Sequence, residues 1–336
     1  MRLGLIGCGR HGGRYASHLL AGDVPGASLV AICRRDACAG GLFAETHGVR
    51  FCPDAASLAS DAAVDGVIIC LPPDLHPDAI LAALGAGRAV LVEKPLAATA
   101  ARAREIERAS AGKLLMVAQT LRFNSIVRAM KERAGDLGQI HGFSTSQRYE
   151  PLPMAWVDDP ARGGALRVTG VHGFDLARHL TGAEVVRVSC ETHAERPGGA
   201  DRSFAALLRL EPGPVLATVD NTRMSEGRSG RLELVGRKGS LLGEHVRGEL
   251  FWLRGLEARP VRVDPPVPTV RECLRAFVAA ARGEIAVPIT AADGRRAVEI
   301  SEACRLSAAA GRAVDVGRAV DVGVVQADET CGRTGQ

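Results

Sequence analysis

Three glycines at fixed spacing, directly after a short apolar run, constrain the fold more than any other feature of the chain. Leu3–Ile6 is followed by a Gly-x-Gly-x-x-Gly motif at Gly7–Gly12, and a helical pattern starts there. In a strand–turn–helix unit the first glycine permits a tight turn, the second lets the backbone approach a pyrophosphate, and the third lets the helix pack on the strand. The alternative is a glycine-rich turn without a ligand. Its place before further strand–helix units favours a dinucleotide site.

Short apolar runs and helical segments alternate through the first third of the chain. The expected strands are Leu3–Ile6, Ser28–Cys33, Gly66–Leu71, Ala89–Val92 and Leu114–Ala118, with helices that include Leu75–Ala86 and Ala100–Ala111. This alternation predicts βαβ units and a parallel sheet covered on both faces. We therefore expect an α/β protein with an N-terminal Rossmann dinucleotide-binding domain over residues 1–120.

After Gln119 the pattern changes to longer runs in which apolar and polar residues partly alternate. The expected strands are Ile140–Tyr149, Glu184–His193, Phe204–Leu210, Leu216–Arg223 and Arg231–Val235, and the expected helices are Phe123–Ala134, Val171–Leu180, Val270–Arg282 and Ala292–Ala310. They predict a C-terminal α/β domain over residues 121–325, with a largely antiparallel open sheet that binds substrate and forms oligomers. The polar tail, 326–336, is expected to be disordered.

Composition excludes several classes of protein. The 336 residues are 46% hydrophobic, which suits two ordinary domain cores, and the net charge of +4 is spread along the chain, which argues against a nucleic-acid partner. No run approaches the ~18 apolar residues of a membrane span. The nine cysteines lack paired Cys-x-x-Cys spacing, which indicates reduced thiols rather than disulfides or a metal site. We expect a cytoplasmic protein with a small-molecule substrate, and the open sheet favours a homodimer or homotetramer.

The end of the second expected strand distinguishes between the two nicotinamide cofactors. NAD-specific sites usually carry an acid there, which accepts hydrogen bonds from the ribose hydroxyls. Here the strand runs into Arg34, Arg35 and Asp36. Two guanidinium groups suit the 2′-phosphate of NADP, since a charged hydrogen bond contributes ~1.5–3 kcal/mol. The alternative is that the arginines point to solvent and Asp36 acts as a displaced acid. We predict that NADP(H) is favoured over NAD(H).

Several segments resemble the Gfo/Idh/MocA family of oxidoreductases. They are Asp65–His76, Ala86–Leu96 with its Glu93-Lys94-Pro95 sequence, Gln119–Asn124 and Gly163–His172. The likeness runs over nearly the whole chain. It implies a nicotinamide-dependent dehydrogenase or reductase that transfers hydride between the cofactor and a secondary alcohol or ketone of a sugar, cyclitol or related polyol.

The resemblance also implies roles for single residues. Lys94 would hydrogen-bond the reacting oxygen, His172 would be the catalytic acid/base, and Asp175, one helical turn later, could orient the imidazole. Only four of the 42 basic residues are lysines, so a lysine at a strand end indicates that a compact donor is needed there. The expected cofactor-binding residues are Gly7, Gly9, Arg10, His11, Gly12, Arg34, Arg35, Leu71, Pro72, His76, Glu93, Lys94 and Gln119.

One position departs from the family pattern. The family usually has Asp four residues before the histidine, where this chain has Val168. Valine can neither relay a proton nor accept a hydrogen bond from a sugar hydroxyl. Three interpretations stay open: an altered substrate, a partner acid from elsewhere such as Asp175, or a chain that binds cofactor with little turnover. The competing functions are a non-catalytic NADP(H)-binding or sensing protein and an NAD-dependent glycosidase or imine reductase on the same fold.

Polar and aromatic residues beside these motifs are candidates to line a substrate pocket between the two domains. They are Arg122, Asn124, Arg148, Tyr149, Trp156, Arg162, Arg167 and Asp175. Two or more inward-pointing arginines among them would indicate an acidic or phosphorylated substrate.

Overall fold

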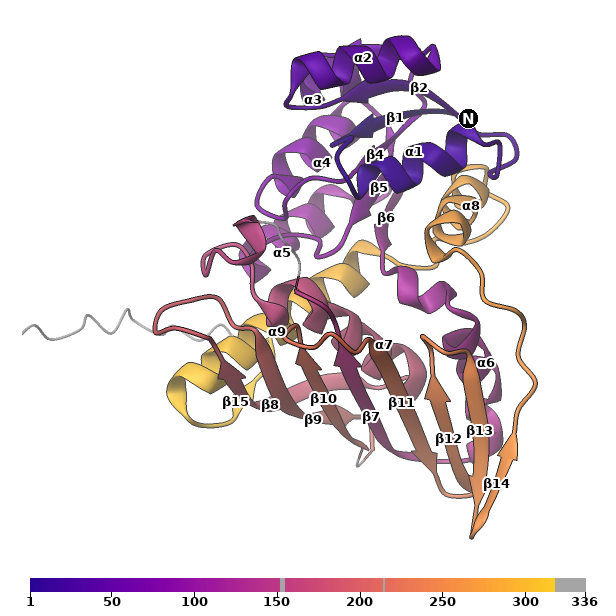
Figure 1. Ribbon diagram of the computed structural model, residues 1–336, viewed down its shortest axis with the longest axis vertical. Helices are drawn as coiled ribbons and strands as arrows, with labels where there is room; N and C mark the ends of the chain where they lie inside the picture. Colours follow the sequence, from indigo (N-terminus) through magenta and orange to yellow (C-terminus); the bar gives the residue numbers. More distant parts are fainter. Residues whose placement is uncertain (152–154, 214, 318–336) are drawn as a thin grey trace, which may run out of the picture.

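The computed structural model describes residues 1–151, 155–213 and 215–317, so the tail predicted at 326–336 lies outside the described residues. It contains a six-stranded sheet and a nine-stranded sheet, each packed against helices (Figure 1). The predicted α/β fold class, a parallel Rossmann sheet followed by a largely antiparallel sheet, is confirmed. In the described part, no helix combines the length and the apolar character that crossing a membrane requires.

The first sheet consists of six parallel strands in the order β3-β2-β1-β4-β5-β6. They are β1 (Arg2–Ile6), β2 (Ser28–Cys33), β3 (Arg50–Cys52), β4 (Gly66–Ile69), β5 (Ala89–Glu93) and β6 (Leu115–Ala118). The sequence did not predict β3, because three residues at a sheet edge are too few to show a pattern. Leu5 of β1 lies between Ile32 of β2 and Ile68 of β4. The strand order reverses at this point, where open parallel sheets bind their ligands.

Helices from both ends of the chain pack on the first sheet. They are α1 (Gly12–Leu20), α2 (Ala37–His47), α3 (Ala55–Ser60), α4 (His76–Gly85), α5 (Ala100–Ala109) and, from late in the sequence, α8 (Thr269–Ala281). Leu274 and Phe277 of α8 are fully buried in the same core as Leu5, and Figure 1 shows α8 beside α1. The first core thus includes a helix from the range 121–325, and the predicted division at residue 120 stays a prediction.

The second sheet has the order β14-β13-β12-β11-β7-β10-β9-β8-β15. Its strands are β7 (Ile140–Arg148), β8 (Glu184–His193), β9 (Ser203–Glu211), β10 (Val215–Thr222), β11 (Ser229–Gly236), β12 (Gly239–Glu244), β13 (Glu249–Arg254), β14 (Glu257–Pro260) and β15 (Val314–Asp315). All neighbouring pairs are antiparallel except β7 and β10. The sequence missed β12 to β15, which are short and lack a continuous alternation of apolar and polar residues.

Among the described residues, helices cover one face of the second sheet and leave the other uncovered. α6 (Ser125–Arg133), α7 (Val171–Thr181) and α9 (Ala291–Ala310) contact β12, β7 and β8 respectively. On the opposite face Leu207, Leu216, Val235 and Leu242 are exposed. The sheet is therefore open on that side.

A buried ion pair connects the end of the first sheet to the helices of the second. Arg122 lies in the 3₁₀ turn Thr120–Phe123, directly after β6. Its Nε and Nη2 donate to the two carboxylate oxygens of Asp175 on α7 at 2.8 and 2.6 Å, and Nη2 also donates to Asp293 on α9 at 3.1 Å. Asp175 is 1% exposed. The guanidinium therefore compensates a carboxylate that water cannot reach.

We predict that Arg122→Met lowers the free energy of unfolding by about 3–5 kcal/mol, because it leaves the buried carboxylate of Asp175 without a partner. Urea denaturation at pH 7 measures the loss. The double variant Arg122→Met/Asp175→Leu should lose much less than Arg122→Met alone, since it buries no uncompensated charge. Strictly additive losses would show that the two residues do not act as a pair.

Candidate active site at the edge of the first sheet

The glycine turn sits at the carboxyl end of β1, and its three glycines meet different surroundings. Gly7 has a φ of +94°, and a Cβ there would lie 2.4 Å from the carbonyl oxygen of Cys70. A Cβ on Gly12 would lie 2.2 Å from the carbonyl oxygen of Gly7, whereas a Cβ on Gly9 would meet nothing within 4 Å. The fold itself thus requires the first and third glycines. The open space beside Gly9, next to the N-terminus of α1, fits the close approach of a dinucleotide phosphate.

Glu93 ties the glycine turn to the end of β5. Its Oε1 accepts hydrogen bonds at 2.6 Å from the Tyr15 hydroxyl and from Nε2 of His11, and its Oε2 accepts from the backbone N–H of Lys94 at 3.1 Å. Burial alone would raise the pKa of Glu93, but the hydrogen bond and charge of His11, the charge of Lys94 and the Tyr15 hydroxyl lower it to about 2. Glu93 is therefore an ionised carboxylate that fixes both the turn and the backbone of Lys94.

The side chain of Lys94 crosses from the first sheet to the second half of the chain. Its Nζ donates to the backbone carbonyl of Val168 at 2.7 Å. Val168 lies in a single turn of π-helix, Leu166–Gly170, that leads into α7. Burial lowers the pKa of Lys94, the carboxylate of Glu93 opposes that shift, and the charge of Arg223 adds to it. A neutral backbone carbonyl thus holds the ammonium group at the position where the family pattern has an acid.

His172 occupies the first turn of α7 and is 9% exposed. Its Nδ1 is buried and has no hydrogen-bond partner among the described residues. Burial and then the charge of Lys94 lower the pKa of His172 well below its ordinary value. Both carboxylate oxygens of Asp175 accept hydrogen bonds from Arg122, so the carboxylate that the sequence offered to orient His172 is engaged elsewhere. Near neutral pH His172 is an uncharged imidazole beside an ammonium group.

The predicted 2′-phosphate residues follow β2. Arg34 is half-buried, Arg35 is exposed, and neither has an ion-pair partner among the described residues. Burial raises the pKa of Cys8, and the charge of Arg34 opposes this rise, which places Arg34 near the glycine turn. Asp36 accepts a hydrogen bond from the N–H of Ala39 at 3.0 Å as the N-cap of α2. Its carboxylate is therefore engaged in capping a helix.

The remaining predicted cofactor residues surround the same turn. Arg10 is exposed, and Leu71 and Pro72, which follow β4, are half-buried. The ring nitrogens of the fully buried His76 lie 2.8 and 2.9 Å from the carbonyl oxygens of Leu71 and Pro95. Gln119 is 1% exposed; its Nε2 donates to the carbonyl of Val171 at 3.4 Å, and its Oε1 has no partner in the described structure. His76 therefore connects the segments that follow β4 and β5, and Gln119 connects the end of β6 to the start of α7.

Most of the predicted substrate residues already have partners within the protein. Besides Arg122 and Asp175, these are Arg148 with Asp220, Arg162 with Asp74, Arg167 with the carbonyl of Pro160, Asn124 with the backbone of Ile126 and His245, and Tyr149 with Gln147. Trp156 is half-buried in the 3₁₀ turn Ala155–Val157. Of the four arginines that were candidates for an acidic substrate, Arg122, Arg148 and Arg162 are therefore paired with carboxylates, whereas Arg167 has a neutral carbonyl as its hydrogen-bond partner.

The sequence missed a second group of polar residues near His172. Gln147, Asn221 and Arg223 are 2, 3 and 2% exposed. Each has a buried nitrogen without a hydrogen-bond partner among the described residues, and so has His245. Alternation within the strands was the available signal, because Gln147 lies two residues before Tyr149, and Asn221 two residues before Arg223. No group of three or more metal-ligating side chains is found in the described ranges.

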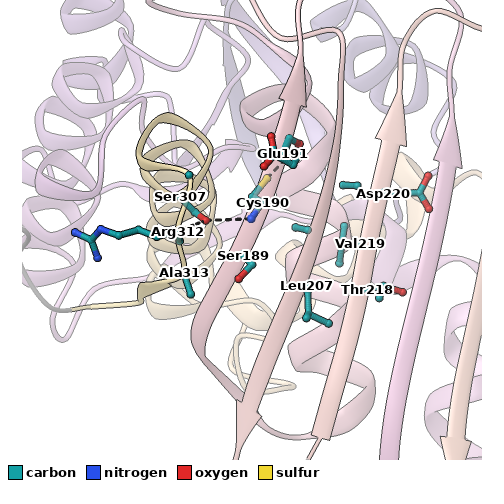
Figure 2. A pocket seen from close by; sticks show the side chains of 13 residues that line it. Ser189, Cys190, Glu191, Leu207, Thr218, Val219, Asp220, Ser307, Arg312 and Ala313 are labelled. Carbon is teal, nitrogen blue, oxygen red and sulfur yellow. Dashed lines mark hydrogen bonds between the residues drawn. The ribbon is translucent and has the colours of Figure 1, made fainter.

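A hollow of about 550 Å³ lies apart from these residues, on the second sheet beside the end of α9. Figure 2 shows that its lining comes from β8, β9, β10, the end of α9 and the turn that follows it. The backbone N–H of Cys190 on β8 donates to the hydroxyl of Ser307 on α9. None of the residues predicted for cofactor or catalysis lines it. The hollow and the predicted site at the sheet edge are therefore separate places on the protein.

Comparison with known proteins extends over both halves of the chain. Residues 1–119 match the oxidoreductase family with an NAD-binding Rossmann fold, and residues 127–242 match the GFO/IDH/MocA C-terminal domain. Inositol 2-dehydrogenase 2 of Saccharopolyspora erythraea is 34% identical over 93% of this chain and 94% of its own length. Inositol 2-dehydrogenase of Rhizobium meliloti is 30% identical over 74% of this chain and 76% of its own.

Solved structures share the fold. Levoglucosan dehydrogenase in complex with NADH and levoglucosan superposes with a TM-score of 0.83 at 25% identity, over 95% of this chain and 99% of its own. An oxidoreductase domain protein from Kribbella flavida superposes with a TM-score of 0.84 at 24% identity, over 94% of this chain and 98% of its own. The second likeness concerns the fold alone.

Substitutions in the glycine turn should separate effects on stability from effects on cofactor binding. We predict that Gly12→Ala lowers the melting temperature, because its methyl group would clash with the backbone of Gly7. Gly9→Ala should melt like the wild type yet bind NADPH and NADH at least tenfold more weakly, because its methyl group fills the space a phosphate would approach. Thermal unfolding and fluorescence titration measure the two effects. Unchanged cofactor affinity in Gly9→Ala would contradict the placement of the phosphate, and Gly13→Ala, also in open space, is the matched control.

Proposed function

Because the chain belongs to the Gfo/Idh/MocA oxidoreductase family, we propose that it transfers hydride between a nicotinamide cofactor and a secondary alcohol or ketone of a sugar, cyclitol or related polyol. One observation carries this proposal: an uncharged His172 and the ammonium group of Lys94 lie close together at the carboxyl edge of the Rossmann sheet. Names of relatives such as inositol 2-dehydrogenase support the substrate class.

The cofactor would be held by the glycine turn and the N-terminus of α1, and its nicotinamide supplies the hydride chemistry when bound. Lys94 donates a hydrogen bond to the reacting oxygen, with the Val168 carbonyl and Glu93 fixing its position. In the oxidative direction His172 accepts the hydroxyl proton of the substrate, and in the reductive direction it returns a proton to the oxygen. The π-helical turn and α7 lie over the edge of the first sheet, and this arrangement limits the access of water to Lys94 and His172.

We propose that NADP(H) is the favoured cofactor. Arg34 and Arg35 have no ion-pair partner in the described part of the chain, and Arg34 lies near the glycine turn. Asp36 caps α2 through one of its oxygens rather than standing at the first position after the strand, where NAD-specific sites carry their acid. Two guanidinium groups without ion-pair partners at this strand end favour a 2′-phosphate.

The proposal extends to the organisation of the protein. The division into a cofactor domain, 1–120, and a substrate and oligomerisation domain, 121–325, agrees with the two separate sheets. The exposed leucines on the open face of the second sheet favour a homodimer or homotetramer. A cytoplasmic location agrees with the reduced state of the eight cysteines that the structure describes.

Val168 favours a second candidate, a protein that binds the cofactor without turnover. A polyol panel that begins with myo-inositol, tested on the wild type and on Val168→Asp, distinguishes the two. Oxidation by the wild type supports the enzyme. Cofactor binding without oxidation or reduction of any compound, and a cofactor affinity that is the same in His172→Ala, would support the binding protein.

Arg34→Ala should weaken NADPH binding by about 10- to 100-fold, because one charged hydrogen bond to the 2′-phosphate is lost, and should leave NADH binding nearly unchanged. Fluorescence titration with both cofactors measures the ratio. Arg108→Ala, which removes an exposed arginine from α5, controls for net charge. Equal losses for both cofactors in Arg34→Ala would contradict the assignment.

The pH dependence should follow from the lowered pKa values. Alcohol oxidation needs an uncharged His172, whose pKa lies below its ordinary 6.5, so kcat/KM should stay level down through pH 6.5 and fall only at lower pH. The pKa of Lys94 is lowered from 10.5, so the alkaline decline should begin below pH 10.5. His172→Asn should lose ~10²–10⁴-fold in kcat/KM, whereas His179→Asn, further along α7, should stay active. An acid decline centred at or above pH 6.5 would count against His172 as the base.

A further inference from the structure

A row of buried polar side chains lies on the helix-covered face of the second sheet and has no part in the mechanism above. β7 and β10 run parallel, with Gln147 opposite Asn221. Arg223 follows Asn221 by two residues, so it continues the same face just beyond the end of β10. We call Gln147, Asn221 and Arg223 the donor row.

Two short contacts connect the donor row to the reacting groups. Lys94 Nζ donates to the carbonyl of Val168 at 2.7 Å, and the hydroxyl of the next residue, Thr169, shares its one proton between Oδ1 of Asn221 and the carbonyl of Ala165, each at 2.9 Å. Arg223 is close enough to Lys94 for its charge to lower the pKa of that ammonium group. The donor row and the predicted catalytic pair therefore belong to one site.

The atoms that the donor row leaves unpaired are all hydrogen-bond donors. Oε1 of Gln147 accepts from the Tyr149 hydroxyl and Oδ1 of Asn221 accepts from Thr169, so each amide has a buried NH₂ group without a partner among the described residues. Nε and Nη2 of Arg223 are also buried and unpaired there. A guanidinium group has no acceptor atom, so only an oxygen-rich acceptor can satisfy it.

The acids near Arg223 do not hydrogen-bond to its buried nitrogens. Burial and then the charge of Arg202 lower the pKa of Arg223, and the charges of Asp158 and Asp201 oppose this shift. However, Asp158 pairs with Arg202 at 2.6 Å, Asp201 accepts from the backbone N–H of Leu166 at 2.7 Å, and Nε and Nη2 of Arg223 have no partner among the described residues. Arg223 is 2% exposed, and buried donors of this kind are costly unless a further acceptor joins them.

The geometry of the unpaired donors indicates the kind of acceptor that fits them. Nε and Nη2 of Arg223 lie on one side of the guanidinium group and are both without a hydrogen-bond partner among the described residues. This fork donates two parallel hydrogen bonds to the two oxygens of a carboxylate.

We propose that Arg223 binds the carboxylate of the substrate, with the amide groups of Gln147 and Asn221 donating to its neighbouring oxygens. Resting on the proposed function, this inference makes the substrate a polyhydroxy acid of the aldonate type, oxidised at a secondary alcohol. The hydride leaves the alcohol carbon for the oxidised nicotinamide, the hydroxyl proton passes to His172, the C–O bond becomes a ketone, and the carboxylate is unchanged.

Binding to a non-reacting complex tests the proposal. Protein saturated with NADPH cannot oxidise an alcohol, so calorimetry reports affinity alone. The probes are three pairs that differ only in a terminal carboxylate: D-gluconate and D-glucitol, D-galactonate and galactitol, D-mannonate and D-mannitol. We expect at least one aldonate to bind about 10- to 100-fold more tightly than its alditol, which is the effect of one charged hydrogen-bonded pair.

Two variants assign that preference to Arg223. Arg223→Met should abolish it by weakening aldonate binding while alditol binding stays unchanged, and Arg223→Lys should retain part of it. Arg209→Met removes one exposed arginine from β9 and should keep the full preference. Without ligand, Arg223→Met should melt at or above the wild-type temperature, because it removes an unpaired buried charge; a purely structural arginine would lower the melting temperature.

Several results would overturn the proposal. They are alditols that bind as tightly as their aldonates, a preference that survives in Arg223→Met, the absence of binding by all three aldonates, or tighter binding of inorganic phosphate or D-glucose 6-phosphate than of D-gluconate. The titrations are repeated with NADH and without cofactor. Failure of both dinucleotides to bind would refute the proposed oxidoreductase function, whereas the comparison of aldonate with alditol tests Arg223 without any turnover.

Discussion

The carboxylate of Glu93 is the contact on which the rest of the site depends. It stands at the end of β5 and accepts hydrogen bonds from the glycine turn through His11, from α1 through Tyr15 and from the backbone of Lys94. A buried ionised carboxylate tolerates loss of these donors poorly. The phosphate-facing turn and the direction of Lys94 are therefore set together, although Tyr15 and Glu93 are 78 positions apart in the sequence.

Lys94 then joins the two sheets. Its ammonium group reaches the carbonyl of Val168, and the π-helical turn that presents this carbonyl leads directly into the helix of His172. Val168 lacks the carboxylate that the family pattern has at this position, but its backbone carbonyl still accepts the hydrogen bond from Lys94. The site thereby has one negative charge fewer than the family pattern would supply. An anionic group on the substrate would supply the missing negative charge, since an unpaired charge inside a protein costs free energy.

Sequence patterns predicted most elements closely because each rests on a local regularity. β2 and β8 begin and end where the apolar pattern placed them, and the helix around His172 was expected within one residue. The short strands β3 and β12 to β15 were missed, because a few residues at an edge show no period and form through pairing with distant neighbours. The same limit applies to α8, whose apolar stripe predicts a helix but not the sheet on which it packs.

The sequence by itself determined the Rossmann half and the glycine turn, because spacing and residue type encode these locally, and its resemblance to a known family implied the oxidoreductase activity and made Lys94 and His172 candidates. Only the tertiary structure decided which charged groups are neutralised. It paired Arg122 with Asp175, Arg148 with Asp220 and Arg162 with Asp74, and left Arg223 buried without a hydrogen bond at Nε or Nη2 within the described residues. Charge pairing depends on distances between residues far apart in the chain, and one-dimensional spacing does not contain those distances.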